Sequence, residues 1–319
     1  MRAAVCRELG PPHVLRVEEL PAPAAEPGQV RVRIEAAAVN FPDVLLVAGQ
    51  YQLKYDLPFI PGSEFAGVVV EGDGFAPGDR VAGTGMAGAF AEEIVVPATS
   101  LWRLPDGLDV RAAAAVGVAH GTAYQALRLV AKLEPGDELV VLGAGGGVGA
   151  AAVQLGAVLG ARVTAIASTP EKLDVAASLG ATNVIDHRTQ DVRATLRELL
   201  PEGSSVVIDP VGGDLSEAAY RSLRWGGRFV TVGFASGVIP KLPLNLVLLK
   251  GAAVLGFQLV DLAKNVPEGV RQCEVELLEL LAAGKAMPHI GSTFDLDHVG
   301  DALRHVADGT AIGKVVITT

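Results

Sequence analysis

The feature that most constrains the fold is a regular alternation of apolar strands and helices between residues 138 and 259. Helical stretches such as VGAAAVQLGAVLG and PEKLDVAASLG lie between most of the strand-like segments. Strands that are apolar along their whole length are buried on both faces, which indicates a parallel sheet covered by helices. The predicted strands are residues 138–143, 162–168, 182–186, 205–211, 227–233 and 252–259.

The first of these strands runs into a glycine-rich turn, ELVVLGAGGGVGAAAVQL. Between a strand and a helix, glycines let the backbone approach a pyrophosphate, which binds at the positive N-terminus of the helix. A strict G-x-G-x-x-G pattern is absent because Ala144 occupies its first glycine position. A purely structural turn is the alternative. The residues predicted to bind a dinucleotide are Gly143, Gly146, Gly147, Val148 and Gly149.

The end of the second strand distinguishes between NADPH and NADH. An NAD site usually has Asp or Glu there to hold the ribose 2′-hydroxyl, but this strand ends in Ser168 and Thr169, with Lys172 just beyond. Small hydroxyls and a cation suit a 2′-phosphate, and His187 and Arg188 can close the same pocket. In the alternative, the hydroxyls only cap a helix and the lysine is solvated. We expect NADPH.

The parts of the chain on either side of this alternation have a different residue pattern. Residues 1–107 read as short strands between Pro and Gly turns, which is typical of a partly closed antiparallel β-domain. The chain ends in the strand GKVVITT, and we expect this end to fold back onto the first domain. A length of 319 residues fits two domains.

Charge and cysteine content exclude several classes of protein. A formal net charge of −10 disfavours nucleic-acid binding. Cys6 and Cys273 are the only cysteines, which excludes a disulfide framework and fits a reducing cytoplasm. No signal peptide is visible, and no run approaches the ~18 apolar residues of a membrane span. We expect a soluble, cytoplasmic protein.

Seven motifs occur in order from residue 36 to the C-terminus: AAAVNFPDVLLVAGQY, PFIPGSEFAGVV, GDRVAGTG, GTAYQAL, LGAGGGVGAAAVQLGAVLGARV, EKLDVAASLGATNVID and GKVVIT. With these motifs the chain resembles the medium-chain dehydrogenase/reductase superfamily, and within it the zinc-independent quinone oxidoreductases. The resemblance implies an α/β protein in which a GroES-like, partly closed β-barrel catalytic domain accompanies a Rossmann domain with a doubly wound, six-stranded parallel sheet. The implied boundaries are residues 1–118 and 258–319 for the catalytic domain, and residues 119–257 for the NADPH-binding domain.

The resemblance also implies an assembly and a place for the ligands. Similar proteins are commonly dimers joined through the last Rossmann strand, here near Ala253–Gln258, so we expect a homodimer. Their ligands bind in a cleft between the domains, beside the positions of Asn40, Tyr51, Thr122 and Phe234.

The stretch IPGSEFAG bears on metal binding. Zinc-dependent relatives carry Gly-His-Glu here, and the His is a catalytic metal ligand, but this chain has Ser63 in its place. A further ligand is usually a Cys in the loop that here reads AAAVNFPD, which contains none. Catalytic zinc needs three protein ligands, so we expect no metal. Adjacent strand residues point to opposite faces, so Ser63 and Glu64 are not a nucleophile–base pair. We expect Glu64 to be a buried or interfacial carboxylate that orders neighbouring loops.

Without a metal, hydrogen-bond donors must stabilise the negative charge that hydride transfer creates on oxygen. We expect Asn40 to donate to the substrate oxygen or to the nicotinamide ribose. Tyr51 would stack on the substrate or donate a proton, since a catalytic Tyr of related enoyl-thioester reductases matches its position. In the alternative, Asn40 caps a turn and Tyr51 is a loop aromatic. Asp43 is more typical of an N-cap or loop anchor, and Leu45, where some quinone reductases have a second Tyr, makes the pocket more apolar.

Further cofactor contacts lie outside the glycine turn. Thr122 matches a residue that contacts the nicotinamide in similar proteins, and the backbone after the fifth strand can hold the carboxamide. Lys314 in the last strand either reaches the cofactor or is solvated. The residues added to the cofactor site are Thr122, Gly233, Phe234, Ser236, Phe257 and Lys314.

These features together predict an NADPH-dependent quinone reductase that transfers hydride directly, without metal or flavin. The alternative is an NADPH-dependent reductase of activated alkenes such as enoyl-thioesters or enones, although the sequence offers no obvious basic cluster for the phosphates of a carrier. A third possibility is a protein that senses NADPH without turnover, against which the presence of Asn40 and Tyr51 argues.

Overall fold

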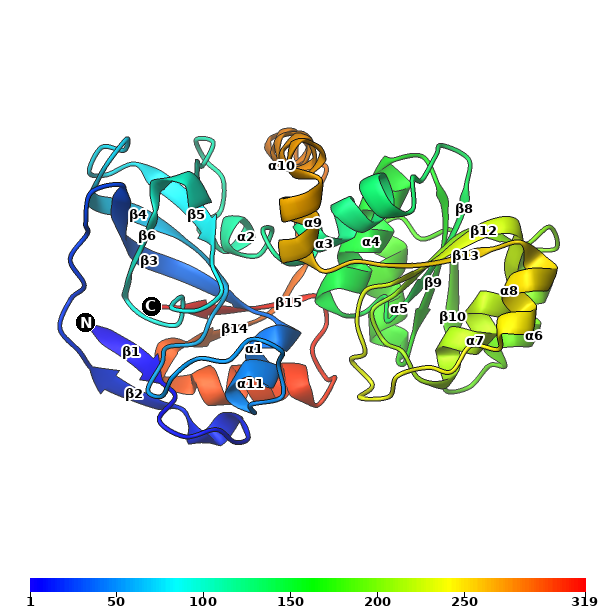
Figure 1. Ribbon diagram of the computed structural model, residues 1–319, viewed down its shortest axis with the longest axis horizontal. Coiled ribbons are helices and arrows are strands. Elements are labelled where there is room, and N and C mark those ends of the chain that lie inside the picture. Colours follow the sequence, from blue (N-terminus) through cyan, green and yellow to red (C-terminus); the bar gives the residue numbers. More distant parts are fainter. The chain divides into compact units, whose positions relative to one another are not determined.

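The chain forms two compact units in the computed structural model, which describes residues 1–319. Figure 1 shows the elements of both. Unit 1 comprises residues 1–118 and 288–319, and unit 2 comprises residues 119–287.

Unit 2 extends to residue 287, beyond residue 257, at which the resemblance places the end of the NADPH-binding domain. The difference arises because helix α10 (Pro267–Ala282) packs against helix α3 (Ala119–Gln125) of unit 2. The hydroxyl of Tyr124 on α3 donates a hydrogen bond of 2.7 Å to Glu276 on α10. The boundaries of the functional domains stay a prediction.

Unit 2 is built on the predicted six-stranded sheet, whose strand order is β10-β9-β8-β11-β12-β13 and whose neighbours all run parallel. This is the strand order of a Rossmann fold. The strands are β8 (Glu138–Leu142), β9 (Arg162–Ala167), β10 (Asn183–Asp186), β11 (Ser204–Asp209), β12 (Leu223–Thr231) and β13 (Ala253–Gly256). The further helices are a π-turn η3 (Ala126–Val130), α4 (Gly147–Val158), α5 (Pro170–Ser178), α6 (Val192–Leu199), α7 (Asp214–Arg221), α8 (Leu244–Lys250) and α9 (Leu259–Asn265).

The apolar runs that predicted this sheet are its buried centre. Strand β11 is buried at every residue, and β8 at every residue after its first. Their side chains pack with those of neighbouring strands and helices into one core, which includes Leu142, Ile166, Val207 and Phe229.

Unit 1 contains a mainly antiparallel sheet of seven strands in the order β14-β15-β3-β4-β5-β7, with β6 paired to β3. A separate two-stranded sheet pairs β1 with β2. The strands are β1 (Arg2–Val5), β2 (Arg16–Glu19), β3 (Gln29–Val39), β4 (Glu64–Gly72), β5 (Arg80–Thr84), β6 (Glu93–Pro97), β7 (Leu101–Arg103), β14 (Ile290–Asp295) and β15 (Lys314–Thr318). The helices are α1 (Phe41–Val47), α2 (Val110–Ala114) and α11 (Val299–Ala307), with short 3₁₀ turns η1 (Pro12–Val14), η2 (Ala98–Ser100) and η4 (Leu296–His298).

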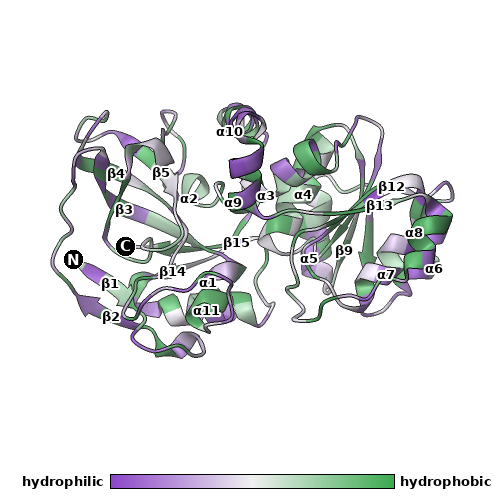
Figure 2. Cartoon of the chain, in the orientation of Figure 1, coloured by the Kyte–Doolittle hydropathy of each residue, from purple (hydrophilic) through white to green (hydrophobic).

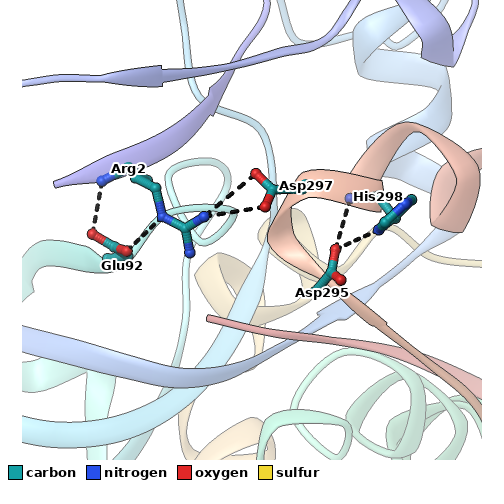
Figure 3. A network of polar contacts seen from close by, with 5 residues as sticks. All are labelled: Arg2, Glu92, Asp295, Asp297 and His298. Atoms are coloured by element: carbon teal, nitrogen blue, oxygen red, sulfur yellow. Dashed lines mark hydrogen bonds and ion pairs between the residues drawn. The ribbon is translucent and has the colours of Figure 1, made fainter.

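Both ends of the chain contribute to unit 1. Strand β15 pairs antiparallel with β3, and Val316 lies opposite Ala38, so the C-terminus folds back onto the N-terminal part as expected. Figure 3 shows a second link, in which Arg2 of β1 bonds Glu92 at 2.9 Å and Asp297 at 3.2 Å. These side chains are largely solvated, and such pairs add little free energy. The sheet pairing is therefore the main connection.

None of the helices combines the length and the apolar character that a membrane-spanning segment requires.

Candidate functional site

The glycine turn of unit 2 connects β8 to α4 with little space between backbones. Gly143 has a positive φ of +61°, and its carbonyl accepts a hydrogen bond of 3.0 Å from the Gly146 amide. A side chain at Gly149 would overlap the carbonyl oxygen of Gly143, so the first full turn of α4 packs directly on the backbone of the loop. Helix α4 begins at Gly147, so its free amides lie at this turn. The turn therefore has the close-packed geometry of a dinucleotide site.

Two cationic side chains, Lys172 and Arg188, and the imidazole of His187 lie near one another beside this turn. The aliphatic part of Lys172 lies over Gly145, where a Cβ would be 2.5 Å from the lysine Cδ. Burial lowers the pKa of Lys172, and the charge of Arg188 lowers it further. Burial also lowers the pKa of His187, again with a contribution from Arg188, while Asp186 acts in the opposite direction. Groups that repel one another in this way are stabilised by a bound anion.

The two hydroxyl residues before α5 differ from each other. The Thr169 hydroxyl accepts a hydrogen bond of 3.4 Å from the Lys172 amide and caps α5, which is the alternative that the sequence left open. Ser168 is only partly buried. The structure therefore places Ser168, Lys172, His187 and Arg188 around the ends of β9 and β10, with no acidic residue at the end of β9.

The loops after β11 and β12 lie together in unit 2. Val211 contacts the glycine turn, since a Cβ on Gly143 would be 2.5 Å from its Cγ2. The Ser236 amide bonds the carbonyl of Val211 at 2.9 Å, so the segment that includes Gly233, Phe234 and Ser236 is tied to the same region. Phe234 is 39% exposed.

Asp209 is a residue that the sequence analysis did not single out. Its buried carboxylate accepts hydrogen bonds of 2.8 Å from the amides of Val211 and Gly212 and one of 2.5 Å from the Ser216 hydroxyl. The available signal was an Asp at the carboxyl end of a buried strand, directly before Pro-Val-Gly-Gly.

The other predicted cofactor residues of unit 2 are more dispersed. Thr122 is buried on α3, and Phe257 follows β13 and is partly exposed. Helix α3, which carries Thr122, packs against α4, whose first residue belongs to the glycine turn. The cofactor roles of Thr122 and Phe257 stay predictions.

Unit 1 contains a second group of functional candidates, a buried polar cluster of Asn40, Asp43, Ser63, Glu64 and Lys314. The Lys314 ammonium donates to the carbonyl of Val39 at 3.1 Å, to Asn40 Oδ1 at 2.6 Å and to Glu64 Oε1 at 2.8 Å. All three of its protons are therefore used inside unit 1. Lys314 is not solvated, and the cofactor contact predicted for it would require one of these bonds to break.

The amide of Asn40 lies at the centre of the buried polar cluster. Its Nδ2 donates to Glu64 Oε1 at 2.9 Å and, at longer distances, to Ser63 Oγ at 3.2 Å and to the Ala38 carbonyl at 3.4 Å. Glu64 is 1% exposed, and its second oxygen accepts a hydrogen bond of 2.9 Å from the Val118 amide. The expectation that Glu64 is a buried carboxylate is confirmed, and its role in ordering neighbouring loops stays a prediction.

Asp43 and Tyr51 complete the group. Asp43 accepts a hydrogen bond of 2.8 Å from the Asn40 amide at the start of α1, as expected of a loop anchor. Burial raises its pKa to about 7, although the Asn40 hydrogen bond and the Lys314 charge oppose the change. Burial, and then the charge of Asp43, raise the pKa of Tyr51. The Tyr51 phenol is therefore protonated at neutral pH and available as a donor.

Comparisons with known proteins agree with both units. Residues 26–106 match the alcohol dehydrogenase GroES-like domain, and residues 147–276 match the zinc-binding dehydrogenase family. The quinone oxidoreductase-like protein 2 homolog of Nematostella vectensis is 38% identical over 100% of this chain and 89% of its own length. The solved quinone oxidoreductase of Thermus thermophilus, studied also as its NADPH complex, is 36% identical with a TM-score of 0.88 over 100% of both chains. The Escherichia coli quinone oxidoreductase complexed with NADPH is 26% identical, with a TM-score of 0.91 over 100% of both chains.

The fold and the two groups of residues define a nucleotide-dependent oxidoreductase. The chain belongs to the medium-chain dehydrogenase/reductase superfamily, among its quinone oxidoreductase-like members.

The zinc that some members of this superfamily bind does not fit the residues of this chain. Ser63 stands where a ligand His would be, and the Lys314 cation lies within the same cluster as the Glu64 carboxylate. No group of three His, Cys, Asp or Glu residues in the structure is placed to hold a metal. We therefore derive no catalytic step through a metal.

Proposed function

We propose that this protein transfers a hydride from NADPH directly to a quinone, without metal or flavin. The proposal is supported by the cationic side chains of Lys172 and Arg188 and the imidazole of His187, which lie beside a glycine turn whose close backbone packing suits a pyrophosphate. Two similar solved structures are quinone oxidoreductases described with NADPH, which supports the same cofactor and acceptor for this chain.

In this proposal the residues of unit 2 hold the cofactor, which supplies the hydride when bound. The backbone of the turn and the N-terminus of α4 would bind the pyrophosphate. Lys172 and Arg188 would pair with the 2′-phosphate, and His187 and Ser168 would add hydrogen bonds to it. Thr122, Gly233, Phe234, Ser236 and Phe257 are retained as proposed contacts to the nicotinamide end.

Tyr51 and Asn40 would act on the acceptor. Tyr51 would donate a hydrogen bond or a proton to the oxygen that becomes negative, because its phenol is protonated and makes no hydrogen bond within the protein. Asn40 is strongly held by Lys314 and Glu64, so its long bonds to Ser63 and Ala38 are the ones that a ligand oxygen would replace.

A second candidate is an NADPH-dependent reductase of activated alkenes, and the Tyr51 phenol favours it. Reduction of an enone or enoyl-thioester leaves an enolate carbon to be protonated, whereas a reduced quinone can take its proton from water. Leu45, which is only partly buried, leaves that part of unit 1 apolar for either acceptor.

One assay panel separates these functions. NADPH oxidation is measured with 1,4-benzoquinone, 9,10-phenanthrenequinone, an enone and crotonyl-CoA, for the unmodified protein and for Tyr51→Phe. We expect the quinones to be the faster acceptors. A loss of activity in Tyr51→Phe of about 100-fold confined to the alkenes would support Tyr51 as a proton donor, and equal losses for all acceptors would contradict that role. Steady NADPH consumption with any acceptor would reject a sensor without turnover.

We also propose a homodimer in the cytoplasm. Strand β13 is the last strand of the sheet and pairs only with β12, so its other edge is open to a second copy. Exposed apolar side chains lie on neighbouring segments, and Figure 2 shows α8 as strongly hydrophobic. They are Trp225 at 81%, Leu244 at 79%, Leu248 at 82% and Leu249 at 73% exposure. The cytoplasmic compartment is proposed because both cysteines are free and buried.

A further inference from the structure

Glu64 connects two parts of unit 1 through its two carboxylate oxygens. Oε1 accepts hydrogen bonds from Asn40 Nδ2 at 2.9 Å and from Lys314 Nζ at 2.8 Å. Oε2 accepts a bond of 2.9 Å from the Val118 amide. A glutamine at this position can accept at only one of its two ends, so the arrangement specifically requires a carboxylate.

Val118 is the last residue of unit 1, and the chain enters unit 2 directly after it. Helix α3 begins at Ala119 and carries Thr122, one turn further on. The residue before Val118 is also tightly held, since a side chain at Gly117 would overlap Thr84 and would lie 3.5 Å from Glu64 Oε2. The last two residues of unit 1 are therefore held by contacts within that unit.

The second connection between the units is held by the partner of Glu64. The chain returns to unit 1 at Pro288, and the Lys314 amide donates a bond of 2.8 Å to the carbonyl of His289. The chain thus leaves and re-enters unit 1 at residues that are bonded to the Glu64–Lys314 pair. Val118 is bonded to the Glu64 side chain, and His289 is bonded to the Lys314 backbone amide.

We propose that Glu64 is a positioning residue, which sets the orientation of the Asn40 amide with one carboxylate oxygen and holds Val118, the last residue of unit 1, with the other. The inference rests on the proposed function, because Asn40 is its proposed substrate residue. In this account the Glu64–Lys314 pair acts through other groups and touches neither substrate nor cofactor.

Because Glu64 and Lys314 carry opposite charges, replacing both together separates the effect on positioning from the effect on stability. Removing one member leaves a buried, uncompensated charge, which strongly destabilises a protein, whereas replacing both by apolar residues of similar volume is often neutral or stabilising. The double variant Glu64→Leu/Lys314→Met therefore removes the hydrogen bonds to Asn40 and Val118 without leaving an uncompensated buried charge. Glu64→Gln is the smaller single change.

Hydrogen–deuterium exchange and steady-state kinetics test the proposal in the full chain. In both variants we expect the amides of residues 116–119 to exchange about tenfold faster or more, because one charge-assisted hydrogen bond is lost. With NADPH and 1,4-benzoquinone, kcat should fall about tenfold while the KM for NADPH stays within about twofold, since the cations of unit 2 are unchanged. The thermal midpoint of the double variant should decrease less than that of Glu64→Gln, which leaves the buried Lys314 charge without its partner.

Tyr124→Phe is the matched control, because it removes the bond that ties α3 to Glu276 of α10 and leaves Glu64 intact. We expect its kcat within about twofold of the unmodified protein. Unchanged exchange at residues 116–119 in the double variant would overturn the proposal, and so would an equal loss of kcat in Tyr124→Phe. If the unmodified protein oxidises no NADPH but exchange responds as expected, the proposed function fails and the anchoring by Glu64 stands. If Glu64→Gln does not fold, the double variant alone decides the outcome.

Discussion

At the scale of single residues, the charged groups of unit 2 and those of unit 1 differ in the neighbours that surround them. Beyond the effect of burial, the charge of Arg188 lowers the pKa of both Lys172 and His187. In the buried polar cluster, Lys314 has a carboxylate partner at 2.8 Å. Groups with lowered pKa values beside a glycine turn are candidates for a ligand site, whereas a buried ion pair such as Glu64–Lys314 belongs to the framework of the fold.

Arg188 offers the cleanest test of the cation group, because its side chain is exposed and its loss does not disturb the core. Arg188→Ala should raise the KM for NADPH about tenfold by removing one charge from the 2′-phosphate, and should change the KM for NADH less than about twofold. Arg193→Ala, which removes another exposed arginine of unit 2, is the control. Equal effects on the two cofactors would contradict the assignment.

Asp43 predicts a pH dependence of stability. Its pKa of about 7 in the folded protein exceeds the ordinary value of 3.8, so the folded state binds more protons than the unfolded chain between these values. Its contribution to stability is full below about pH 4 and is lost as the pH rises to about 7, by up to about 1.4 kcal/mol per pH unit. Asp43→Asn should lack this component in urea unfolding measured from pH 5 to pH 8. Parallel profiles for Asp43→Asn and for the exposed control Asp56→Asn would refute it.

At the scale of elements, the turn between β8 and α4 shows how one glycine fixes the geometry of a site. A Cβ on Gly149 would overlap backbone, whereas a Cβ on Gly146 would be 3.5 Å from the nearest atom, the Gly143 carbonyl oxygen. The backbone angles of Gly146, φ −91° and ψ 172°, are also open to other residues.

Alanine at these two positions should therefore give different results. Gly149→Ala should lower the free energy of unfolding by roughly 2–4 kcal/mol, because the helix must move away from the loop. Gly146→Ala should cost about 1 kcal/mol or less, the usual difference at an N-cap. Urea denaturation of both variants measures the difference, and similar losses would mean that the packing of α4 on the loop is not what requires glycine.

The sequence predicted the elements better than the contacts between them. Strand positions followed from apolar runs, as for the strand predicted at residues 138–143, which is β8 (Glu138–Leu142) in the structure. Two contacts between distant segments were not foreseen. Nothing in the sequence near Lys314 shows that it is buried against Glu64, 250 positions away. The packing of α10 on α3, which extends unit 2 to residue 287, depends equally on tertiary contacts.

The site residues show the same difference between local patterns, which the sequence reveals, and contacts between distant segments, which it does not. The glycine turn and the cations beside it are local to three successive β-strands, so their pattern was visible in the sequence. Asn40 was predicted as a substrate contact, but its Oδ1 accepts from Lys314 and its Nδ2 donates to Glu64. Asn40 follows β3, Glu64 begins β4 and Lys314 begins β15, and only the folded sheet of unit 1 brings these three residues together.

At the scale of the whole molecule, the exposed apolar residues near β13 predict the assembly. Leu248 on α8 is 82% exposed, so Leu248→Glu should leave the folded chain intact and shift a dimer toward monomer. Analytical ultracentrifugation measures the change. Val184→Glu, on β10 at the opposite edge of the same sheet, is the control and should leave the assembly unchanged. A monomeric unmodified protein, or equal effects of both substitutions, would exclude this face as the interface.

The central claim is that the chain reduces quinones with NADPH and without a metal. The most direct test is kcat/KM of the unmodified protein for NADPH and for NADH, with 1,4-benzoquinone as acceptor, before and after treatment with a metal chelator. We predict a preference for NADPH of at least about tenfold and no effect of the chelator. A preference for NADH, or activity that the chelator abolishes and zinc restores, would contradict the account.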